Sequence, residues 1–461
     1  DALGRLVLEK YYDGSKRRLI YDDADNIVGI VGRGGRSISI VVDKMGQVIS
    51  RSATAELSWI PHVKQKFEYD GMGRLLKAVD GDVENNFIYD SMSRRIAEKN
   101  GKRWTINGYS DLGELISLRD PVGRTFYRTY DAAGRLKGVL YDKKRILSFY
   151  YDATGGLKEQ SFGDDMSLEI EGDRWGRVLQ RNYFRGNGIS MGWHEIHRDD
   201  QGGVDFEIGR YDVKRKFERD PLGRLVGVVD SAKHSENSLI REWLYDLDDL
   251  GNVVNDHVVE YDSGQVIGID DRVFKYDALG RLVWTMSGTV YTDYSYDAFD
   301  RLVGVSTNGI QKSFTWSDWN LLVEDAPQES FTYVHYDGSN APLAYIGAED
   351  VSYFQTDRLG SVTGVVTGDG KKMAQCEYDP YGNRYECEDF NRPFCFTGQI
   401  CDGDPNLIYM RYRHYDPVTG RFLTPDPLGL KMSLHTEFNV HATPGISYHK
   451  MQGGASHLTF A

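Results

Sequence analysis

The heptapeptides YDGMGRL (Tyr69–Leu75), YDAAGRL (Tyr130–Leu136) and YDALGRL (Tyr276–Leu282) are near-copies of one motif. Weaker copies occur along most of the chain, and successive motif aspartates are mostly 19 to 22 residues apart. A similarity that keeps its spacing over so many copies is typical of a repeat protein. The motif therefore predicts a structure assembled from one small unit instead of several independent domains.

The residue types of the motif predict a β-hairpin tip. An aspartate at the start of a tight turn accepts backbone N–H bonds, and a glycine three positions later adopts the positive φ that a short bulged hairpin loop needs. A period of about 21 residues leaves two strands of roughly seven residues per unit. We expect the tyrosines to stack on one another in successive units. We expect the arginine to bridge to an aspartate or to a carbonyl of the adjoining turn.

The composition also favours strands. Among 461 residues there are 50 glycines and 30 tyrosines but only 12 prolines, so turns are frequent and aromatic rings supply much of the apolar surface. A two-stranded unit cannot bury both faces, so the hairpins must pair edge to edge. The predicted fold is all-β: one long antiparallel sheet whose right-handed strand twist makes it spiral and enclose a volume.

Charge and hydropathy exclude two classes of protein. No apolar run approaches the 18 residues that cross a bilayer, so no membrane span is predicted. The formal net charge of −14 argues against nucleic-acid binding by the shell. The chain begins DALGRLVLEK, without an initiator methionine, and we expect it to be an internal segment in which a secretion signal cannot be read.

All four cysteines, Cys376, Cys387, Cys395 and Cys401, fall in one stretch near the C-terminus. Their spacing does not match the C-x2-4-C pairs of a zinc site, so no metal or other cofactor is predicted. Free structural thiols are the favoured interpretation, and one or two local disulfides are the alternative.

The motif copies resemble the YD repeats of Rhs proteins, toxin-complex C subunits and teneurins. The resemblance is most specific in DRLGSVTGVVTGDG from Asp357 and in IYMRYRHYDPVTGRFLTPDPLGL (Ile408–Leu430), which are similar to the Rhs-associated core. It implies a hollow shell around an unfolded or partly folded toxin. Residues 1–355 would form the YD-repeat shell, 356–430 the core as an inward C-terminal plug, and 431–461 an internal peptide or the start of the toxin.

The resemblance also implies one chemical step. Proteins similar to this one cut themselves after a DPxGL sequence with an aspartyl protease, which puts the catalytic carboxyl at Asp426 and the scissile bond at Leu430–Lys431. Hydrolysis by aspartates needs two carboxyl groups close enough to share a proton. Asp416 is the candidate partner.

Two arginines, Arg413 and Arg421, are candidates for holding a carboxylate in its ionised form. The sequence departs from the family pattern further on, because relatives carry a second DPxG and another aspartate some twenty residues later. From Pro427 to Ala461 there is no aspartate. Either the cut follows Leu430 with Asp416 as partner, or this form does not cleave.

The resemblance therefore implies a shell that sequesters a C-terminal effector and releases it by one self-cleavage, for interbacterial or host-directed delivery. The resemblance implies synthesis in a bacterial cytoplasm, secretion with a type VI spike of the VgrG/PAAR kind or a toxin-complex B subunit, and an immunity protein against the toxin. Enzyme activity stays open, because single-turnover autoproteolysis is the only chemistry expected. The alternative is a non-catalytic structural or adhesive YD-repeat protein of the teneurin or wall-associated kind.

Overall fold

The computed structural model consists almost entirely of antiparallel strands. It describes residues 1–11, 14–186, 188–249, 251–336, 339, 341–348, 350–401 and 407–426, with the backbone of 446–449 and 457–460. Helical geometry in these residues is limited to three short 3-10 turns, η1 (Arg33–Gly35), η2 (Arg210–Asp212) and η3 (Phe396–Gly398). No helix of the described chain is long and apolar enough to cross a membrane.

The first sheet has 22 strands, each paired antiparallel with the next in sequence. They are β1 (Leu8–Lys10), β2 (Lys16–Tyr21), β3 (Ile27–Val31), β4 (Arg36–Val42), β5 (Val48–Ala55), β6 (Val63–Tyr69), β7 (Leu75–Asp80), β8 (Val83–Tyr89), β9 (Arg95–Asn100), β10 (Arg103–Tyr109), β11 (Leu115–Arg119), β12 (Thr125–Tyr130), β13 (Leu136–Tyr141), β14 (Lys144–Tyr151), β15 (Leu157–Phe162), β16 (Met166–Gly172), β17 (Val178–Arg185), β18 (Ile189–Arg198), β19 (Val204–Ile208), β20 (Val213–Arg219), β21 (Leu225–Ala232) and β22 (Ser235–Leu244).

The second sheet has 14 strands in the same consecutive order, and two smaller sheets follow it. The second sheet contains β23 (Val259–Asp262), β24 (Gln265–Ile269), β25 (Arg272–Tyr276), β26 (Leu282–Ser287), β27 (Val290–Tyr296), β28 (Leu302–Thr307), β29 (Ile310–Ser317), β30 (Asn320–Asp325), β31 (Ser330–His335), β32 (Pro342–Ile346), β33 (Val351–Thr356), β34 (Val362–Thr367), β35 (Lys372–Tyr378) and β36 (Arg384–Glu388). The smaller sheets are β37 (Ile400–Cys401), β38 (Ile408–Met410), β39 (Arg413–Asp416) and β40 (Arg421–Phe422), then β41 (Ile446–His449) and β42 (His457–Phe460).

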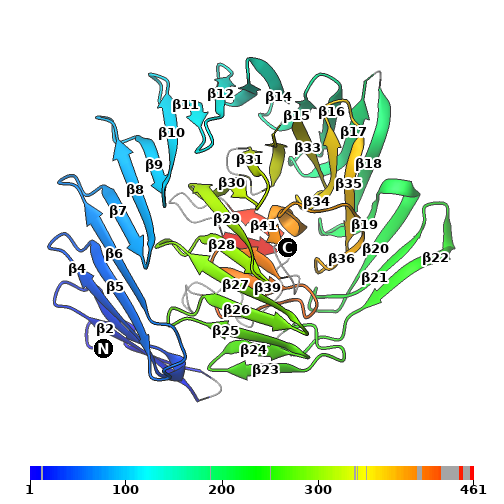
Figure 1. The fold of residues 1–461 in the computed structure, drawn as a ribbon. Helices are drawn as coiled ribbons and strands as arrows, with labels where there is room; N and C mark the ends of the chain where they lie inside the picture. The colour runs from blue at the N-terminus through cyan, green and yellow to red at the C-terminus, as the bar shows by residue number, and fades with distance from the viewer. Residues whose placement is uncertain are drawn as a thin grey trace.

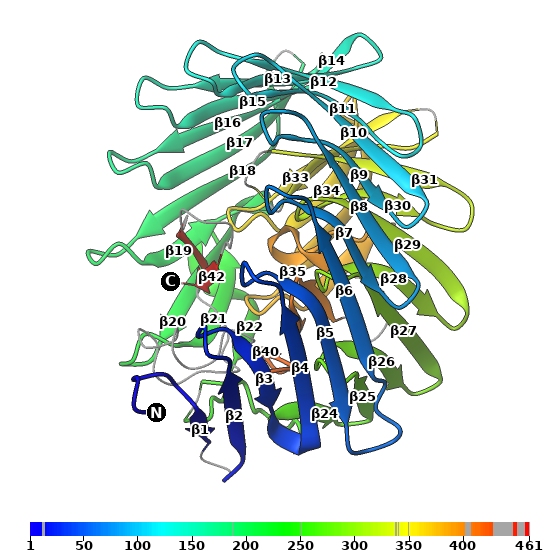
Figure 2. The same ribbon diagram turned by 90° about the vertical axis from the view of Figure 1, so that its left-hand side faces the viewer.

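The all-β prediction is confirmed, with one difference in continuity. The ladder is interrupted between β22 and β23, so the wall is two sheets instead of one. The first sheet curves around the second, which in turn lies around β37–β40 (Figures 1 and 2). Neither long sheet closes into a barrel, because β1 and β22, like β23 and β36, each have one paired neighbour in the described ladders.

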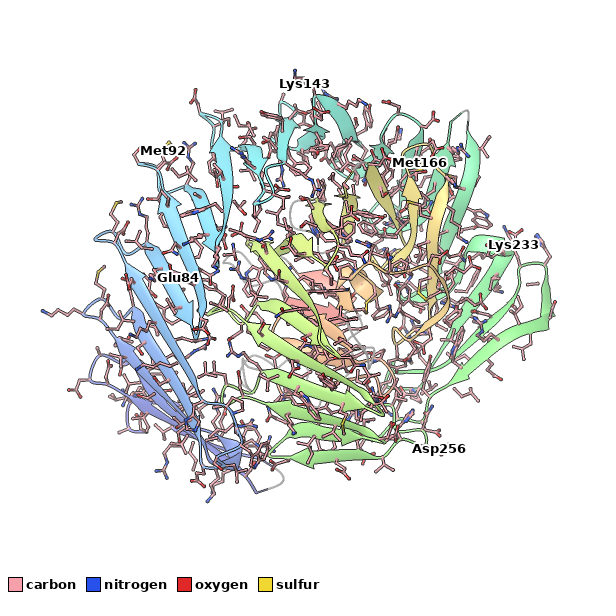
Figure 3. All side chains as sticks on the ribbon, in the orientation of Figure 1. Glu84, Met92, Lys143, Met166, Lys233 and Asp256 are labelled. Atoms are coloured by element: carbon pink, nitrogen blue, oxygen red, sulfur yellow. A yellow bond between two sulfur atoms is a disulfide. The ribbon has the colours of Figure 1, made fainter. Side chains whose placement is uncertain are left out.

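The motif turns have the predicted geometry. In the copy at Tyr69, one oxygen of Asp70 accepts the backbone N–H groups of Met72 and Arg74 at 2.9 and 3.0 Å. The other oxygen accepts the Nε–H of Arg74 at 2.6 Å. Gly73 has a φ of 80°, a backbone conformation that residues with a Cβ rarely adopt. Turn residues such as Met92 and Lys143 lie at the periphery of the first sheet (Figure 3).

Successive units are joined by one repeated arrangement, which we call the YD lock. Arg74 donates from Nη1 to the carbonyl of Asp90 in the next turn at 3.0 Å, and its guanidinium lies 5.0 Å from the ring centroid of Tyr89. The Tyr89 hydroxyl returns a hydrogen bond to the carbonyl of Leu75 at 2.9 Å. The ring therefore stacks on the arginine of the preceding unit, where we expected tyrosine to stack on tyrosine.

The ring-to-carbonyl hydrogen bond of the YD lock recurs in both long sheets. Tyr130, Tyr151 and Tyr296 each donate to a carbonyl 14 or 15 residues earlier, and these carbonyls belong to Leu115, Leu136 and Leu282. Trp316 does the same with its indole N–H at 2.6 Å from the Leu302 carbonyl. The ring position of the YD lock therefore requires a large ring with a polar atom at its far end, and both tyrosine and tryptophan meet this requirement.

The two long sheets share a core and a set of buried ion pairs. Phe162 of the first sheet packs edge-on against Tyr353 of the second, with ring centroids 5.8 Å apart. Arg301, in a motif turn of the second sheet, reaches Glu98 of the first at 3.1 Å as well as its own turn partner Asp297 at 2.7 Å. Asp297 is fully buried, whereas the aspartates of the first sheet's clear motif turns are partly exposed. The second sheet therefore docks its turns on the first.

The sheet β37–β40 packs inside the second sheet. Leu407, Tyr409 and Leu423 belong to the same buried cluster as residues of the second sheet. The Tyr409 hydroxyl accepts the N–H of Leu302 at 3.0 Å and donates to the carbonyl of Asp300 at 3.1 Å. The second sheet continues past residue 355, the predicted end of the repeat shell, to Glu388, and β37 begins at Ile400.

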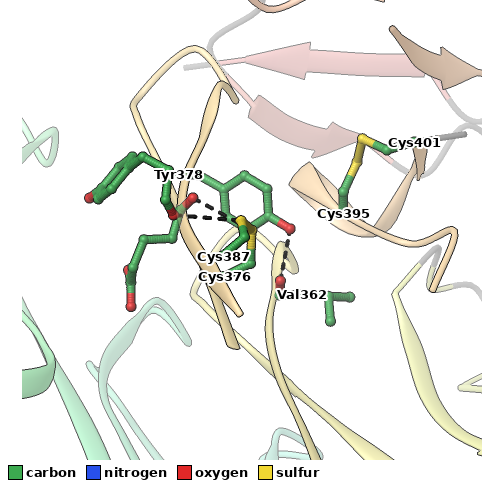
Figure 4. Close-up of a disulfide and its surroundings, with 8 residues drawn as sticks. Val362, Cys376, Tyr378, Cys387, Cys395 and Cys401 are labelled. Carbon is green, nitrogen blue, oxygen red and sulfur yellow. Dashed lines mark hydrogen bonds between the residues drawn. A yellow bond between two sulfur atoms is a disulfide. The ribbon is translucent and has the colours of Figure 1, made fainter. Parts of the chain in front are cut away.

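The four cysteines form two disulfides, Cys376–Cys387 and Cys395–Cys401, so the favoured prediction of free thiols is wrong (Figure 4). Spacing along the chain could not show this pairing, because it depends on which residues the β35–β36 hairpin and the loop before β37 place side by side.

Substitution of Arg301 tests the importance of the buried locks. Arg301→Gln removes the counter-charge of two buried carboxylates, so we expect a loss of about 3–5 kcal/mol in the free energy of unfolding. Arg135→Gln is the matched control, because Arg135 holds the same motif position in a partly exposed turn. Denaturant unfolding monitored by tryptophan fluorescence measures both. Equal losses would show that docking of the sheets does not depend on these charges.

Acidification should loosen the first sheet before the second. Backbone N–H donation from Arg74 and Arg94 holds the pKa of Asp70 and Asp90 below the usual 3.8, so their stabilising contribution is present above that pH and is lost as the pH falls below it. Burial raises the pKa of Asp379 in the second sheet. The charged form of Asp379 therefore destabilises the fold, and protonation at low pH removes that cost. We expect the earliest pepsin cuts between pH 4 and pH 2 to fall within residues 8–244. First cuts within 259–388 would contradict this.

Candidate functional site

The predicted site residues lie on or beside the β39–β40 hairpin. The turn between these strands ends at Gly420, which has a φ of 60°. A Cβ at this position would lie 2.8 Å from Tyr381 and 3.0 Å from Val253. Only glycine therefore lets the hairpin approach both neighbouring segments, and this contact fixes Asp416 at the end of β39.

Asp416 is fully buried and held on both oxygens. Arg272 of β25 donates to its two oxygens at 2.5 and 3.2 Å. Thr419 donates to Oδ2 from its backbone N–H at 2.9 Å and from its hydroxyl at 2.5 Å. These contacts join the hairpin to the second sheet by a buried, bidentate ion pair, which fixes the position of the hairpin on that sheet.

Asp426 has a different environment, because its side chain is 39% exposed. Arg413 of β39 lies 3.3 Å from Oδ2 of Asp426 and stacks on Phe422, with the guanidinium carbon 3.5 Å from the ring centroid. Burial lowers the pKa of Arg413, and Asp426 opposes that shift. The pair leaves Asp426 open to solvent beside a fixed cation.

Each of the two predicted catalytic aspartates is held by a different arginine, Asp416 by Arg272 and Asp426 by Arg413. Arg413 forms an ion pair with the carboxylate of Asp426. Arg421 donates to three neutral acceptors, the hydroxyl of Tyr261 and the carbonyls of Val253 and Thr419. The predicted scissile bond, Leu430–Lys431, lies outside the described residues.

Sequence reasoning missed two buried residues of this region. Arg272 is 144 positions from Asp416, and no motif connects them. His414 of β39 is buried and contacts the rings of Tyr294 and Tyr409. Burial lowers the pKa of His414 to about 3, so this imidazole is neutral at physiological pH.

Metal chemistry finds no support in the described part of the chain. No group of three or more His, Cys, Asp or Glu side chains there is arranged to hold a metal ion.

Known proteins resemble this chain both in sequence and in fold. The family model of the teneurin YD-shell matches residues 209–444, just over half of the chain. Double-stranded DNA deaminase toxin A of Burkholderia cenocepacia is 24% identical over 474 residues, which covers 93% of this chain and 28% of the toxin. Teneurin-3 of Mus musculus is 23% identical over 441 residues, which covers 91% of this chain and 15% of the teneurin.

A solved structure has the same fold. The Photorhabdus luminescens Tc holotoxin pore superimposes with a TM-score of 0.77 at 13% identity, over 96% of this chain and 27% of that chain. The present chain thus spans less than a third of the length of each of these proteins.

Two substitutions should separate the roles of the aspartates. Asp416→Asn leaves Arg272 buried without its counter-charge, so we expect a loss of about 3–5 kcal/mol in the free energy of unfolding. Asp426→Asn removes a partly exposed ion pair, so its effect should stay within about 1 kcal/mol. Denaturant titration of both variants measures the difference. Comparable losses would refute the assignment of Asp416 to structure.

Proposed function

This chain belongs to the teneurin YD-shell family, and from that membership we propose that it is part of a shell that sequesters a C-terminal effector. One observation carries the proposal: two curved sheets are arranged one around the other, and the chain then turns inward as β37–β40 (Figure 1). A relative named as a DNA deaminase toxin and a Tc holotoxin structure with this fold support an effector as the cargo.

The partners follow from the same proposal. The cargo is a toxin encoded after this segment, and a cognate immunity protein protects the producing cell. A secretion spike or a toxin-complex B subunit carries the assembled shell out of the bacterial cytoplasm. The segments that bind these partners belong to the longer protein.

We further propose that the shell frees its cargo by hydrolysing the bond between Leu430 and Lys431. One water adds to the Leu430 carbonyl carbon, the C–N bond breaks, and a new carboxylate and a new amine result. Asp426 exchanges protons with this water because it is open to solvent and only four residues before the bond. Arg413 stabilises negative charge beside it. Asp416 acts as a positioning residue through Arg272.

The alternative is a non-catalytic YD-repeat shell with a structural or adhesive role. Two observations favour it: Asp416 is fully engaged by Arg272 and Thr419, and Teneurin-3 matches nearly the whole chain. In this alternative Asp426 caps a turn, because Asp-Pro-x-Gly is also an ordinary turn sequence.

Self-cleavage can be tested in the full-length parent protein on a denaturing gel. We expect the wild type to yield a C-terminal fragment that begins at Lys431 by mass spectrometry, and Asp426→Asn to remain uncut. Asp220→Asn is the matched control, because Asp220–Gly223 has the same DPLG sequence as Asp426–Gly429.

The outcomes separate the two candidate functions. One uncut chain in every sample would reject self-cleavage and favour the non-catalytic shell. Cleavage that persists in Asp426→Asn would remove this residue from the mechanism. Loss of cleavage in Asp220→Asn would show that the cut depends on general integrity of the repeat turns.

A further inference from the structure

The last strand of the second sheet, β36, also closes a contact with the first sheet. The Tyr385 hydroxyl accepts a hydrogen bond from Arg215 of β20 at 2.7 Å, and its ring lies 5.6 Å from that of Trp243 in β22. Glu386 forms an ion pair with Arg241 of β22. These contacts make a seam, which we define as the meeting of β36 with β20 and β22.

The backbone ladder that holds β36 in place is incomplete. Within the described ladders β36 pairs with β35 alone, and the register shifts between Gln375 and Glu377. At this shift Cys376 of β35 is joined to Cys387 of β36 (Figure 4). A covalent link therefore secures the edge strand where regular backbone pairing is interrupted.

The two disulfides differ in access. Cys387 is exposed, so a small thiol can reach one sulfur of the first bridge. Cys395 and Cys401 are buried in a cluster with Ile408 and Tyr415, which shields the second bridge. Because thiol–disulfide exchange requires direct attack on a sulfur, the first bridge is the accessible target.

A cavity of about 230 Å³ lies behind the seam. Its lining includes Ile240 and Arg241 of β22, Tyr385 and Glu386 of β36, and Trp193 of β18. The strand that the disulfide secures is thus one wall of a solvent-accessible pocket, and displacement of β36 would widen this pocket.

We propose that the Cys376–Cys387 disulfide is a redox-sensitive latch whose reduction releases β36 and opens the seam. A thiolate attacks the exposed sulfur of Cys387 and Cys376 leaves as a thiolate, which takes up a proton. A second thiol resolves the mixed disulfide. In total two donor thiols supply two electrons and two protons and become one disulfide, and the protein gains two thiols.

The use of the latch rests on the proposed function. Disulfides persist outside the cytoplasm and are reduced inside it. A shell exported from a bacterial cytoplasm would therefore form the bridge after export, keep its seam closed in transit and open it on arrival in a target cell. The latch itself needs no cargo and can be tested on this chain whether or not it cleaves.

The first experiment asks which bridge is reduced. The air-oxidised chain is titrated with reduced glutathione without denaturant, alkylated, and analysed by peptide mass spectrometry. We expect Cys376 and Cys387 to be modified first and Cys395 and Cys401 to stay protected. The proposal is overturned if the four cysteines are free thiols in the oxidised sample, or if the buried bridge opens first.

The second experiment measures the seam by hydrogen exchange of residues 384–388. Reduction, or the single change Cys387→Ser, should accelerate their exchange on the order of 100-fold, the chain-entropy effect of releasing an eleven-residue loop. Exchange within β10–β15 should stay unchanged and serves as the internal control. Unchanged exchange at 384–388 in both samples would overturn the latch. Accelerated exchange without any effector release would instead count against the proposed function.

Discussion

The hydrogen bond from a ring to the backbone of the preceding unit, with an arginine between them, is the constraint on which the fold depends. In the unit at Tyr89, the ring contacts Arg74 and the hydroxyl reaches the carbonyl of Leu75. The arginine also holds its own turn aspartate, so one side chain connects a turn to the next unit. Each such contact is worth little alone, and repetition along two sheets makes their sum a determinant of the curvature.

The same motif has two energetic roles. In most turns of the first sheet the aspartate and arginine are partly exposed and mainly shape the turn, whereas Asp120 is buried and accepts a hydrogen bond from Thr332 of the second sheet. In the second sheet the turn at Asp297 is buried, and Arg301 must also satisfy Glu98 of the first sheet. A buried pair of this kind contributes little when complete and costs several kcal/mol when one partner is removed. The motif thus shapes hairpins in one sheet and specifies docking in the other.

Repetition explains how much could be predicted from sequence. The spacing of motif aspartates such as Asp70 and Asp131 predicts hairpins, antiparallel pairing and an all-β wall, because each of these features is local. The Arg272–Asp416 pair, the break after β22 and the Cys376–Cys387 bridge depend on how distant segments meet in space. No local sequence pattern predicts such contacts between distant segments. The resemblance to Rhs proteins indicated the family, while the roles of Asp416 and Asp426 differ through burial, which a shared Asp-Pro sequence does not reveal.

The buried turns of the second sheet have a consequence for assembly. Arg281 and Arg301 find their distant partners, Asp80 and Glu98, about 200 residues earlier in the chain. Besides their local partners Asp277 and Asp297, these arginines need the first sheet to complete their contacts, so the first sheet is expected to act as a template for the second. Synthesis from the N-terminus delivers the two in that order. Each new hairpin of the second sheet would therefore be added to an edge that is already formed, and the strands β37–β40 would be enclosed last.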